Sequence, residues 1–208
     1  MKLIMHIPSP LLRLGAAGTF ACMLVVAAPA QLVQNGGFEE IDDPATPNIF
    51  TDWTLSGNGD FFFVTGDAHS GSRAASFGAV GSQTFLAQTI ITTIPGETYT
   101  LDFWLSNLRN GDELNPNLFT GSWGGIQFAT LSNVPAFGYT KFSYELTASS
   151  SSTLLQFGFQ NKFSEWHFDD VSVTETSRGV PDSASTVLLL GTALAGLGVF
   201  QRKRRVAR

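Results

Sequence analysis

The sequence predicts an all-β protein, a β-sandwich of the jelly-roll type with about eight to ten strands. The composition is 43% hydrophobic and only 14% charged, with 21 glycines and 18 phenylalanines, which favours strands and turns over helices. Apolar residues between positions 31 and 176 recur mostly at every second position, and turn-forming residues separate these runs at short intervals. Both patterns are typical of a sandwich made of many short strands.

The clearest alternation lies at residues 98–105, where Tyr99, Leu101, Phe103 and Leu105 alternate with polar residues and Trp104. A strand with this pattern buries one face and leaves the other toward solvent. Further expected strands are residues 83–91, 125–130, 141–146, 153–160 and 167–174. The segment 112–125 contains Asn115-Pro116-Asn117 and several glycines, so we expect it to be a long surface loop.

The N-terminal thirty residues predict a secretory signal peptide. Lys2 and Arg13 precede an apolar stretch at 14–28, and small residues follow up to Ala30, where cleavage is expected. Cys22 is the only cysteine and lies inside this stretch, so the mature chain is expected to lack cysteine. Disulfides, thiolate nucleophiles and cysteine zinc sites are thereby excluded from residues 31–176, the expected folded domain.

The expected mature region is strongly acidic. Residues 31–179 hold sixteen acidic and five basic side chains, a formal net charge of −11. A nucleic-acid partner requires a basic face for the phosphates. The charge therefore excludes a nucleic-acid role.

The C-terminal part, residues 177–208, is predicted to be a linker followed by an address in three pieces. Residues 180–186 read Val-Pro-Asp-Ser-Ala-Ser-Thr, an apolar run of fourteen residues follows at 187–200, and a basic tail at 201–208 ends the chain. The run is shorter than the roughly 20 residues that span a bilayer comfortably, but flanking residues can extend it. We expect a short transmembrane helix, transient or retained, whose basic end stays cytoplasmic.

Residues 180–186 resemble the Val-Pro-Asp-Ser-Gly-Ser-Thr form of the PEP-CTERM sorting motif, with Ala184 at the usual glycine. The resemblance implies that an exosortase-type membrane protease recognises the tail and that the protein reaches the cell surface or extracellular matrix. The matching motif residues are Val180, Pro181, Asp182, Ser183 and Thr186. The alternative is an anchor helix that is never cut.

The two ends of the domain carry a second resemblance. Residues 32–39, Leu-Val-Gln-Asn-Gly-Gly-Phe-Glu, and residues 166–173, Trp-His-Phe-Asp-Asp-Val-Ser-Val, resemble the opening and closing strands of galactose-binding-like jelly rolls among the carbohydrate-binding modules. The resemblance implies a structural Ca²⁺ held by Glu39 and Asp170, with backbone carbonyls near residues 69–72. Strict alternation would point Asp169 to the opposite face. The alternative is that both carboxylates face solvent or cap turns.

Sugar binding is expected where an aromatic side chain stands on an otherwise polar strand face, because flat rings stack on pyranoses and polar neighbours bind the hydroxyls. Trp104 fits this description, and Trp123, in the predicted loop, is a second aromatic candidate. Gln156 and Gln160 lie opposite the apolar positions of their strand. The alternative for each tryptophan is packing in the core.

An enzymatic function is not expected. His69 and His167 are the only histidines after residue 30, and neither accompanies a nucleophile-elbow sequence. The sequence therefore predicts an exported, non-enzymatic surface or matrix protein that binds polysaccharide. A structural matrix protein without a specific ligand and a cryptic hydrolase remain the alternatives.

Overall fold

A computed structural model describes residues 30–42, 50–90 and 92–176. Within them the chain forms ten strands and no helix, which confirms the predicted all-β sandwich. The strands are β1 (Thr54–Gly57), β2 (Phe62–Thr65), β3 (Ala74–Phe77), β4 (Thr84–Ile90), β5 (Thr98–Asn107), β6 (Asn117–Trp123), β7 (Ile126–Ser132), β8 (Phe137–Thr147), β9 (Thr153–Asn161) and β10 (Trp166–Glu175).

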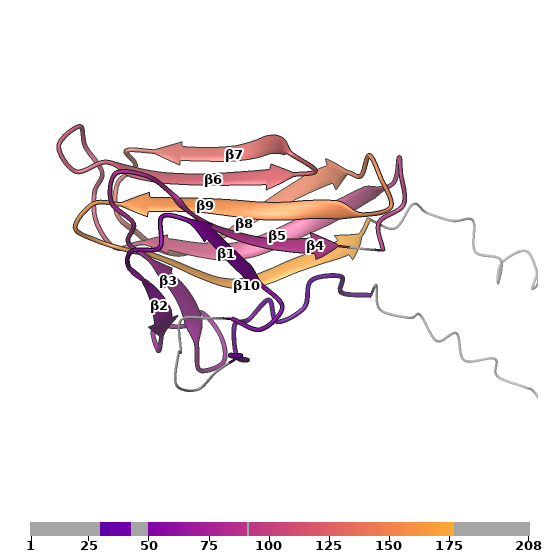
Figure 1. Cartoon of the computed structure of the whole chain (residues 1–208), viewed down its shortest axis with the longest axis horizontal. Helices are drawn as coiled ribbons and strands as arrows, with labels where there is room; N and C mark the ends of the chain where they lie inside the picture. Colours follow the sequence, from indigo (N-terminus) through magenta and orange to yellow (C-terminus); the bar gives the residue numbers. More distant parts are fainter. Residues whose placement is uncertain (1–29, 43–49, 91, 177–208) are drawn as a thin grey trace, which may run out of the picture.

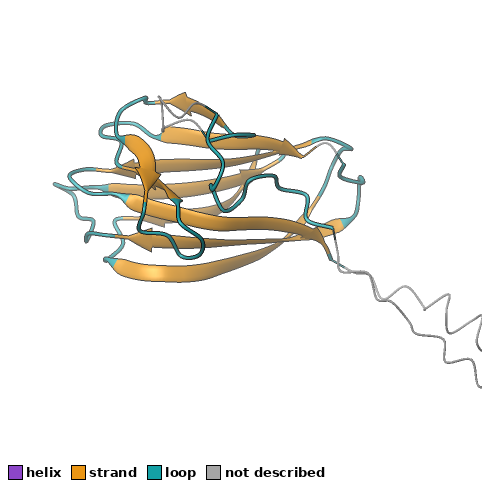
Figure 2. Ribbon diagram, turned by 90° about the horizontal axis from the view of Figure 1, so that it is seen from below, coloured by secondary structure: helices purple, strands orange, loops and turns teal. Residues whose placement is uncertain are grey.

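The strands form two antiparallel five-stranded sheets, which lie face to face (Figure 1). One sheet has the order β1-β4-β9-β6-β7 and is called sheet I here; the other has the order β2-β3-β10-β5-β8 and is called sheet II. The two ends of the described domain lie side by side, because Gln31 forms a bridge with Thr174 (Figure 2). Both ends of the described domain therefore lie at the same end of the sandwich.

Aromatic rings fill the space between the sheets. Phe103 of sheet II contacts Phe119 and Phe157 of sheet I, at centroid distances of 5.6 and 5.3 Å. Phe77 and Phe159 stack across the same interface at 4.1 Å. All five rings are fully buried. The inward halves of the alternating strands thus supply one continuous core.

The alternation in β5 is confirmed in detail. Tyr99, Leu101, Phe103 and Leu105 are buried, whereas the side chains between them are only partly buried. Trp104 therefore lies on the outer face of sheet II, the face turned away from the core. β10 and β8 flank β5 and contribute to the same face.

The predicted loop at 112–125 is wrong in its second half. β6 begins at Asn117 and lies between β7 and β9 inside sheet I. The asparagine suggested a turn, but its side chain is buried and replaces backbone pairing, since Oδ1 accepts from Val134 N and Nδ2 donates to Val134 O, both at 2.9 Å. Asparagine often forms turns, but Asn117 is a buried residue that hydrogen-bonds the neighbouring backbone.

The predicted opening strand at 32–39 is also wrong. Beyond the bridge at Gln31, this segment forms turns and bends, with Asn35 and Phe38 in left-handed backbone conformations. The predicted signal peptide and the apolar run at 187–200 lie outside the described residues. Within the described ranges, no helix is long and apolar enough to cross a membrane.

Candidate functional site

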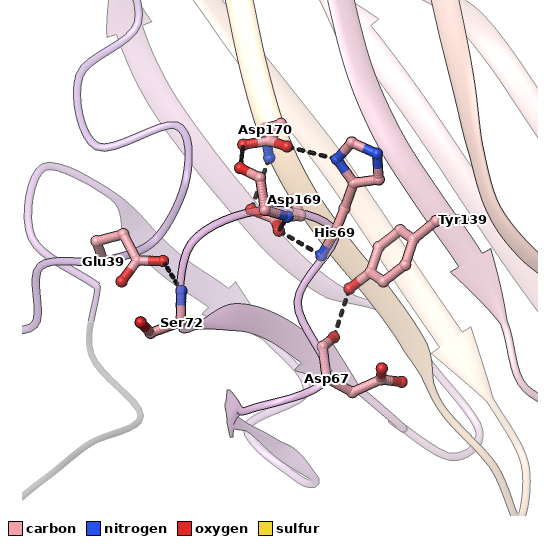
Figure 3. Close-up of polar contacts among 8 residues, drawn as sticks. Glu39, Asp67, His69, Ser72, Tyr139, Asp169 and Asp170 are labelled. Carbon is pink, nitrogen blue, oxygen red and sulfur yellow. Dashed lines mark hydrogen bonds and ion pairs between the residues drawn. The ribbon is translucent and has the colours of Figure 1, made fainter.

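The connection between β2 and β3, residues 66–73, folds over the outer face of sheet II. It is called the β2–β3 loop here. The imidazole of His69 stacks on the indole of Trp104, with centroids 3.7 Å apart and planes 14° apart. Tyr139 of β8 meets the same imidazole edge-on at 5.6 Å, and its hydroxyl donates to Asp67 O at 2.7 Å (Figure 3). One side of the Trp104 ring is therefore covered by the protein itself.

A β-bulge in β10 turns two neighbouring carboxylates toward this loop. The register between β10 and β5 shifts between Asp169 and Ser172, and Asp170 has a left-handed φ of 49°. The predicted orientation of Asp169 to the opposite face is therefore wrong. A bulge inserts an extra residue and interrupts the alternation of side chains, so Asp169 and Asp170 both contact the β2–β3 loop.

Asp169 anchors the first part of the loop from below. Its side chain is completely buried, and its carboxylate accepts hydrogen bonds from the backbone N–H groups of His69 (2.8 Å), Ser70 (3.2 Å) and Asp170 (2.7 Å). Burial raises the pKa of Asp169 to about 6, although these N–H groups oppose the shift. The carboxyl is a structural anchor with no exposed surface.

Asp170 and Glu39 hold the rest of the loop. Asp170 pairs with His69 Nδ1 at 2.6 Å and accepts from Ser70 Oγ at 2.7 Å. Glu39 Oε1 accepts from the backbone N–H groups of Ser72 at 2.6 Å and Arg73 at 3.0 Å. Gly71 has a φ of 67°, and a Cβ there would lie 2.1 Å from Glu39 Oε1, so a glycine is required for this approach.

These contacts engage the two carboxylates of the predicted calcium site, Glu39 and Asp170, with groups of the protein itself. Ca²⁺ requires six to eight oxygen ligands around one point, whereas Glu39 and Asp170 lie at opposite ends of the turn that His69 begins (Figure 3). Backbone N–H groups, which repel a cation, point at the Glu39 and Asp169 carboxylates. Within the described residues, no three histidine, cysteine or acidic side chains are grouped for metal binding. Calcium binding stays a prediction, which melting curves in calcium and in chelator can test.

A polar groove of about 410 Å³ lies beside the loop, between the N-terminal segment and the outer face of sheet II. Trp104, Asp102, Lys141 and Asp170 line it, together with Gly36 and its neighbours. Asp102 Oδ2 pairs with Lys141 Nζ at 2.9 Å. Burial raises the pKa of Asp102, but the hydrogen bonds from Lys141 and Ser143 and the charge of Lys141 together outweigh it and hold this pKa below its usual value. The groove thus combines an indole with two carboxylates and one ammonium group.

Among the described residues, one carboxylate oxygen of Asp102 lacks a hydrogen bond. Its Oδ1 is buried yet lacks a hydrogen-bond partner within the described part of the chain. An unpaired buried oxygen is costly, but this atom has almost no accessible surface for a ligand. The polar groups that the groove presents to a ligand are the charged side chains of Asp102, Lys141 and Asp170.

The other predicted ligand contacts lie elsewhere. The predicted exposure of Trp123 on a loop is wrong: its side chain is 4% exposed, its indole N–H donates to Thr147 O at 3.1 Å, and its ring contacts Tyr99. Gln156 and Gln160 are half-buried on the outer face of β9, in sheet I. They therefore cannot share one site with Trp104, which lies on sheet II.

Sequence reasoning missed two residues of this site. His69, which covers Trp104, and Tyr139, which supports it, come from segments far from β5 in the sequence. No local pattern pairs them with Trp104. The only available indication was that a tryptophan on a polar face requires some cover.

Comparison with known proteins gives a sorting motif and a fold. Residues 179–204 match the VPDSG-CTERM motif, which confirms the predicted motif at 180–186. The comparison with curated proteins gave no match. The motif match lies in the tail and does not include the β-sandwich.

Three solved structures resemble the domain. The carbohydrate-binding module TmCBM61, solved with β-1,4-galactotriose, has 18% identity and a TM-score of 0.53, over 70% of this chain and 99% of that one. The CBM22-1 xylan-binding domain of Xyn10C from Paenibacillus barcinonensis has 15% identity and a TM-score of 0.52, over 74% and 100%. The K3 cleaved adhesin domain of Lys-gingipain from Porphyromonas gingivalis has 14% identity and a TM-score of 0.51, over 71% and 99%. The chain is thus a jelly-roll β-sandwich with the fold of carbohydrate-binding modules.

Proposed function

We propose that this chain is an exported surface protein whose sandwich binds carbohydrate without catalysis, in the groove beside Trp104. The observation that carries the proposal is an indole at the groove wall, held from one side by His69, next to the charged pair of Asp102 and Lys141. Rings provide stacking surface for the C–H face of a sugar, and charged polar groups beside them bind its hydroxyls. The fold of the solved carbohydrate-binding modules supports the same function.

The charged states of the groove favour binding over hydrolysis. Glycoside hydrolysis requires one carboxyl that stays protonated beside a second that is ionised. The pKa of Asp102 is held low, so it cannot serve as the acid. The carboxyl with a raised pKa, Asp169, is buried under the loop and accepts only backbone N–H groups.

Replacing Trp104 by alanine is the direct test. We expect Trp104→Ala to reduce retention on soluble β-1,4-galactan or xylan, the ligand classes of the first two solved modules above, by about two- to twelvefold, because one stacked ring contributes roughly 0.5–1.5 kcal/mol. The free energy of unfolding should fall by no more than about 2 kcal/mol, since the ring is only partly buried. Affinity electrophoresis and urea unfolding of the purified protein measure the two effects.

Gln156→Ala, on sheet I, is the matched control and should leave retention unchanged. The opposite result, with Trp104→Ala harmless and Gln156→Ala damaging, would move the binding site to the outer face of sheet I. Equal retention of all variants would contradict both sites.

We also propose that the C-terminal tail is recognised and cleaved during export. The matched motif supports recognition of the tail by an exosortase-type protease and cleavage within or just after residues 180–186. We expect the mature protein to lack the residues beyond about Thr186, because the motif, the apolar run and the basic tail form one signal. Intact-mass measurement of the surface fraction from a native-like host checks this, and a surface species that still ends at Arg208 would contradict cleavage.

A further inference from the structure

Two phenylalanine rings protrude at one end of the sandwich. Phe61 is 67% exposed in the β1–β2 connection, and Phe163 is 69% exposed in the β9–β10 connection. Both connections lie at the left end of the molecule in Figure 1. Large aromatic side chains are usually buried, so their exposure here requires an explanation.

Both phenylalanines have an unusual backbone conformation. Phe61 has a φ of 53° and Phe163 a φ of 63°, a left-handed conformation that bulky residues rarely adopt. Hydrogen bonds fix the two turns: Gly78 N donates to Phe61 O at 2.7 Å, and Asn161 N donates to Ala79 O at 2.9 Å. Residues 78–79, directly after β3, thus hydrogen-bond both the β1–β2 connection and the end of β9. Strain of this kind is found where a site is built for binding.

A cleft of about 290 Å³ lies between the two turns. Its walls include Phe61, Val80 and Phe163, whereas Ser164 and Glu165 add polar groups. Glu165 is held in place, because its Oε2 accepts from Ser76 Oγ at 3.2 Å and lies 3.5 Å from His167 Nε2. The cleft therefore has apolar walls and a fixed hydrogen-bond acceptor.

This chemistry selects the kind of ligand. A wholly apolar partner would cover the Glu165 carboxylate without offering it a hydrogen bond, which is unfavourable. A pyranose presents C–H faces to the rings and hydroxyl donors to the carboxylate. The size of the cleft also suits a small ligand better than a protein surface.

The position of the cleft is suited to an external ligand. The bridge between Gln31 and Thr174 lies near the end of β10, far from Trp166, the residue at which β10 begins. The β9–β10 turn leads into Trp166, so the cleft lies at the end of the domain opposite Glu175, the last residue of β10 (Figure 1). A chain held by its C-terminus at a surface would present this end outward.

We propose that the Phe61–Phe163 cleft is a second carbohydrate site, which takes one sugar ring between its aromatic walls. The ligand class rests on the proposed function, but the site is separate from the Trp104 groove. With two sites on one domain, the protein can engage two segments of one polysaccharide or two chains, and the second contact strengthens the first.

Serine substitutions test the cleft by affinity electrophoresis of the full chain in gels with β-1,4-galactan or xylan. We expect Phe61→Ser and Phe163→Ser each to weaken retention at least threefold, in the wild type and in the Trp104→Ala background. Ile126→Ser is the matched control, because Ile126 is 73% exposed at the opposite end, where β7 begins, and it should change nothing. Melting temperatures show whether each variant folds.

The outcomes separate the two sites. Loss of retention only on Trp104→Ala overturns the cleft and leaves the proposed function intact. Loss only on the phenylalanine substitutions supports the cleft and contradicts the groove. If no variant changes retention, or if the phenylalanine substitutions abolish self-association in sedimentation instead, the cleft does not bind sugar.

Discussion

Asp169→Ala should lower the free energy of unfolding by at least about 3 kcal/mol, because buried donors that lose their acceptor cost roughly 1–3 kcal/mol each. Three backbone N–H groups depend on this carboxylate, those of His69, Ser70 and Asp170. Alanine accepts none of them, and the side chain is fully buried, so water can replace the carboxylate only if the β2–β3 loop opens.

Urea unfolding at pH 7 measures this loss. Glu145→Ala is the control, since Glu145 is an exposed carboxylate on β8, and it should change stability by no more than about 0.5 kcal/mol. A loss for Asp169→Ala as small as that of the control would mean that the loop does not depend on the carboxylate.

The same carboxyl predicts how stability varies with pH. Its pKa in the folded protein is raised to about 6, above the value of about 3.9 expected in the unfolded chain. Between these values the folded state holds a proton that the unfolded state has released. The stabilising contribution is therefore complete below about pH 4 and is lost as the pH rises through 6, by about 3 kcal/mol in total.

Comparison of the wild type with Asp169→Asn isolates this effect, because the two chains differ only at the titrating side chain of residue 169. The difference between the two free energies of unfolding should change between pH 4 and pH 7 and be constant above. A constant difference across the whole range would show that Asp169 has an ordinary pKa and is ionised in the folded protein at pH 5.

Local patterns predicted the parts of the fold that rest on alternation. β5 and β9 have the long period-two pattern that identifies a half-buried strand, and both occur where expected. β3 shows why others were missed: its four residues, Ala74–Phe77, are all buried, so no alternation marks it. The sequence of a short strand with both faces buried cannot be distinguished by periodicity from another short apolar segment.

Alternation along the strands also predicted part of the candidate site. Alternation placed Trp104 on an outer face, and the structure agrees. It failed at Asp169, because the bulge in β10 depends on contacts with the N-terminal segment and the β2–β3 loop rather than on the residues of β10 alone. The stacking of His69 on Trp104 joins segments 35 positions apart, which a local pattern cannot reveal.

The contact between the N-terminal segment and that bulge should not tolerate a side chain at Gly36. Gly36 O accepts from Val171 N at 2.9 Å, and a Cβ at Gly36 would lie 2.0 Å from Val171 O. Because the obstacle is backbone, no rotamer change relieves it. We expect Gly36→Ala to lower the free energy of unfolding by about 3 kcal/mol, by separating the N-terminal segment from β10.

Gly37→Ala provides a matched control one residue away, because a Cβ at Gly37 would meet nothing closer than Asp170 Oδ1 at 3.6 Å, an ordinary contact. Its stability should stay within about 0.5 kcal/mol of the wild type. Both glycines line the groove, so retention on polysaccharide distinguishes two roles. If the N-terminal segment forms one wall of the binding groove, Gly36→Ala should lose retention together with stability, whereas Gly37→Ala should keep both. Urea unfolding and affinity electrophoresis measure the pair, and equal stability of the two variants would show that the segment can leave β10 at little cost.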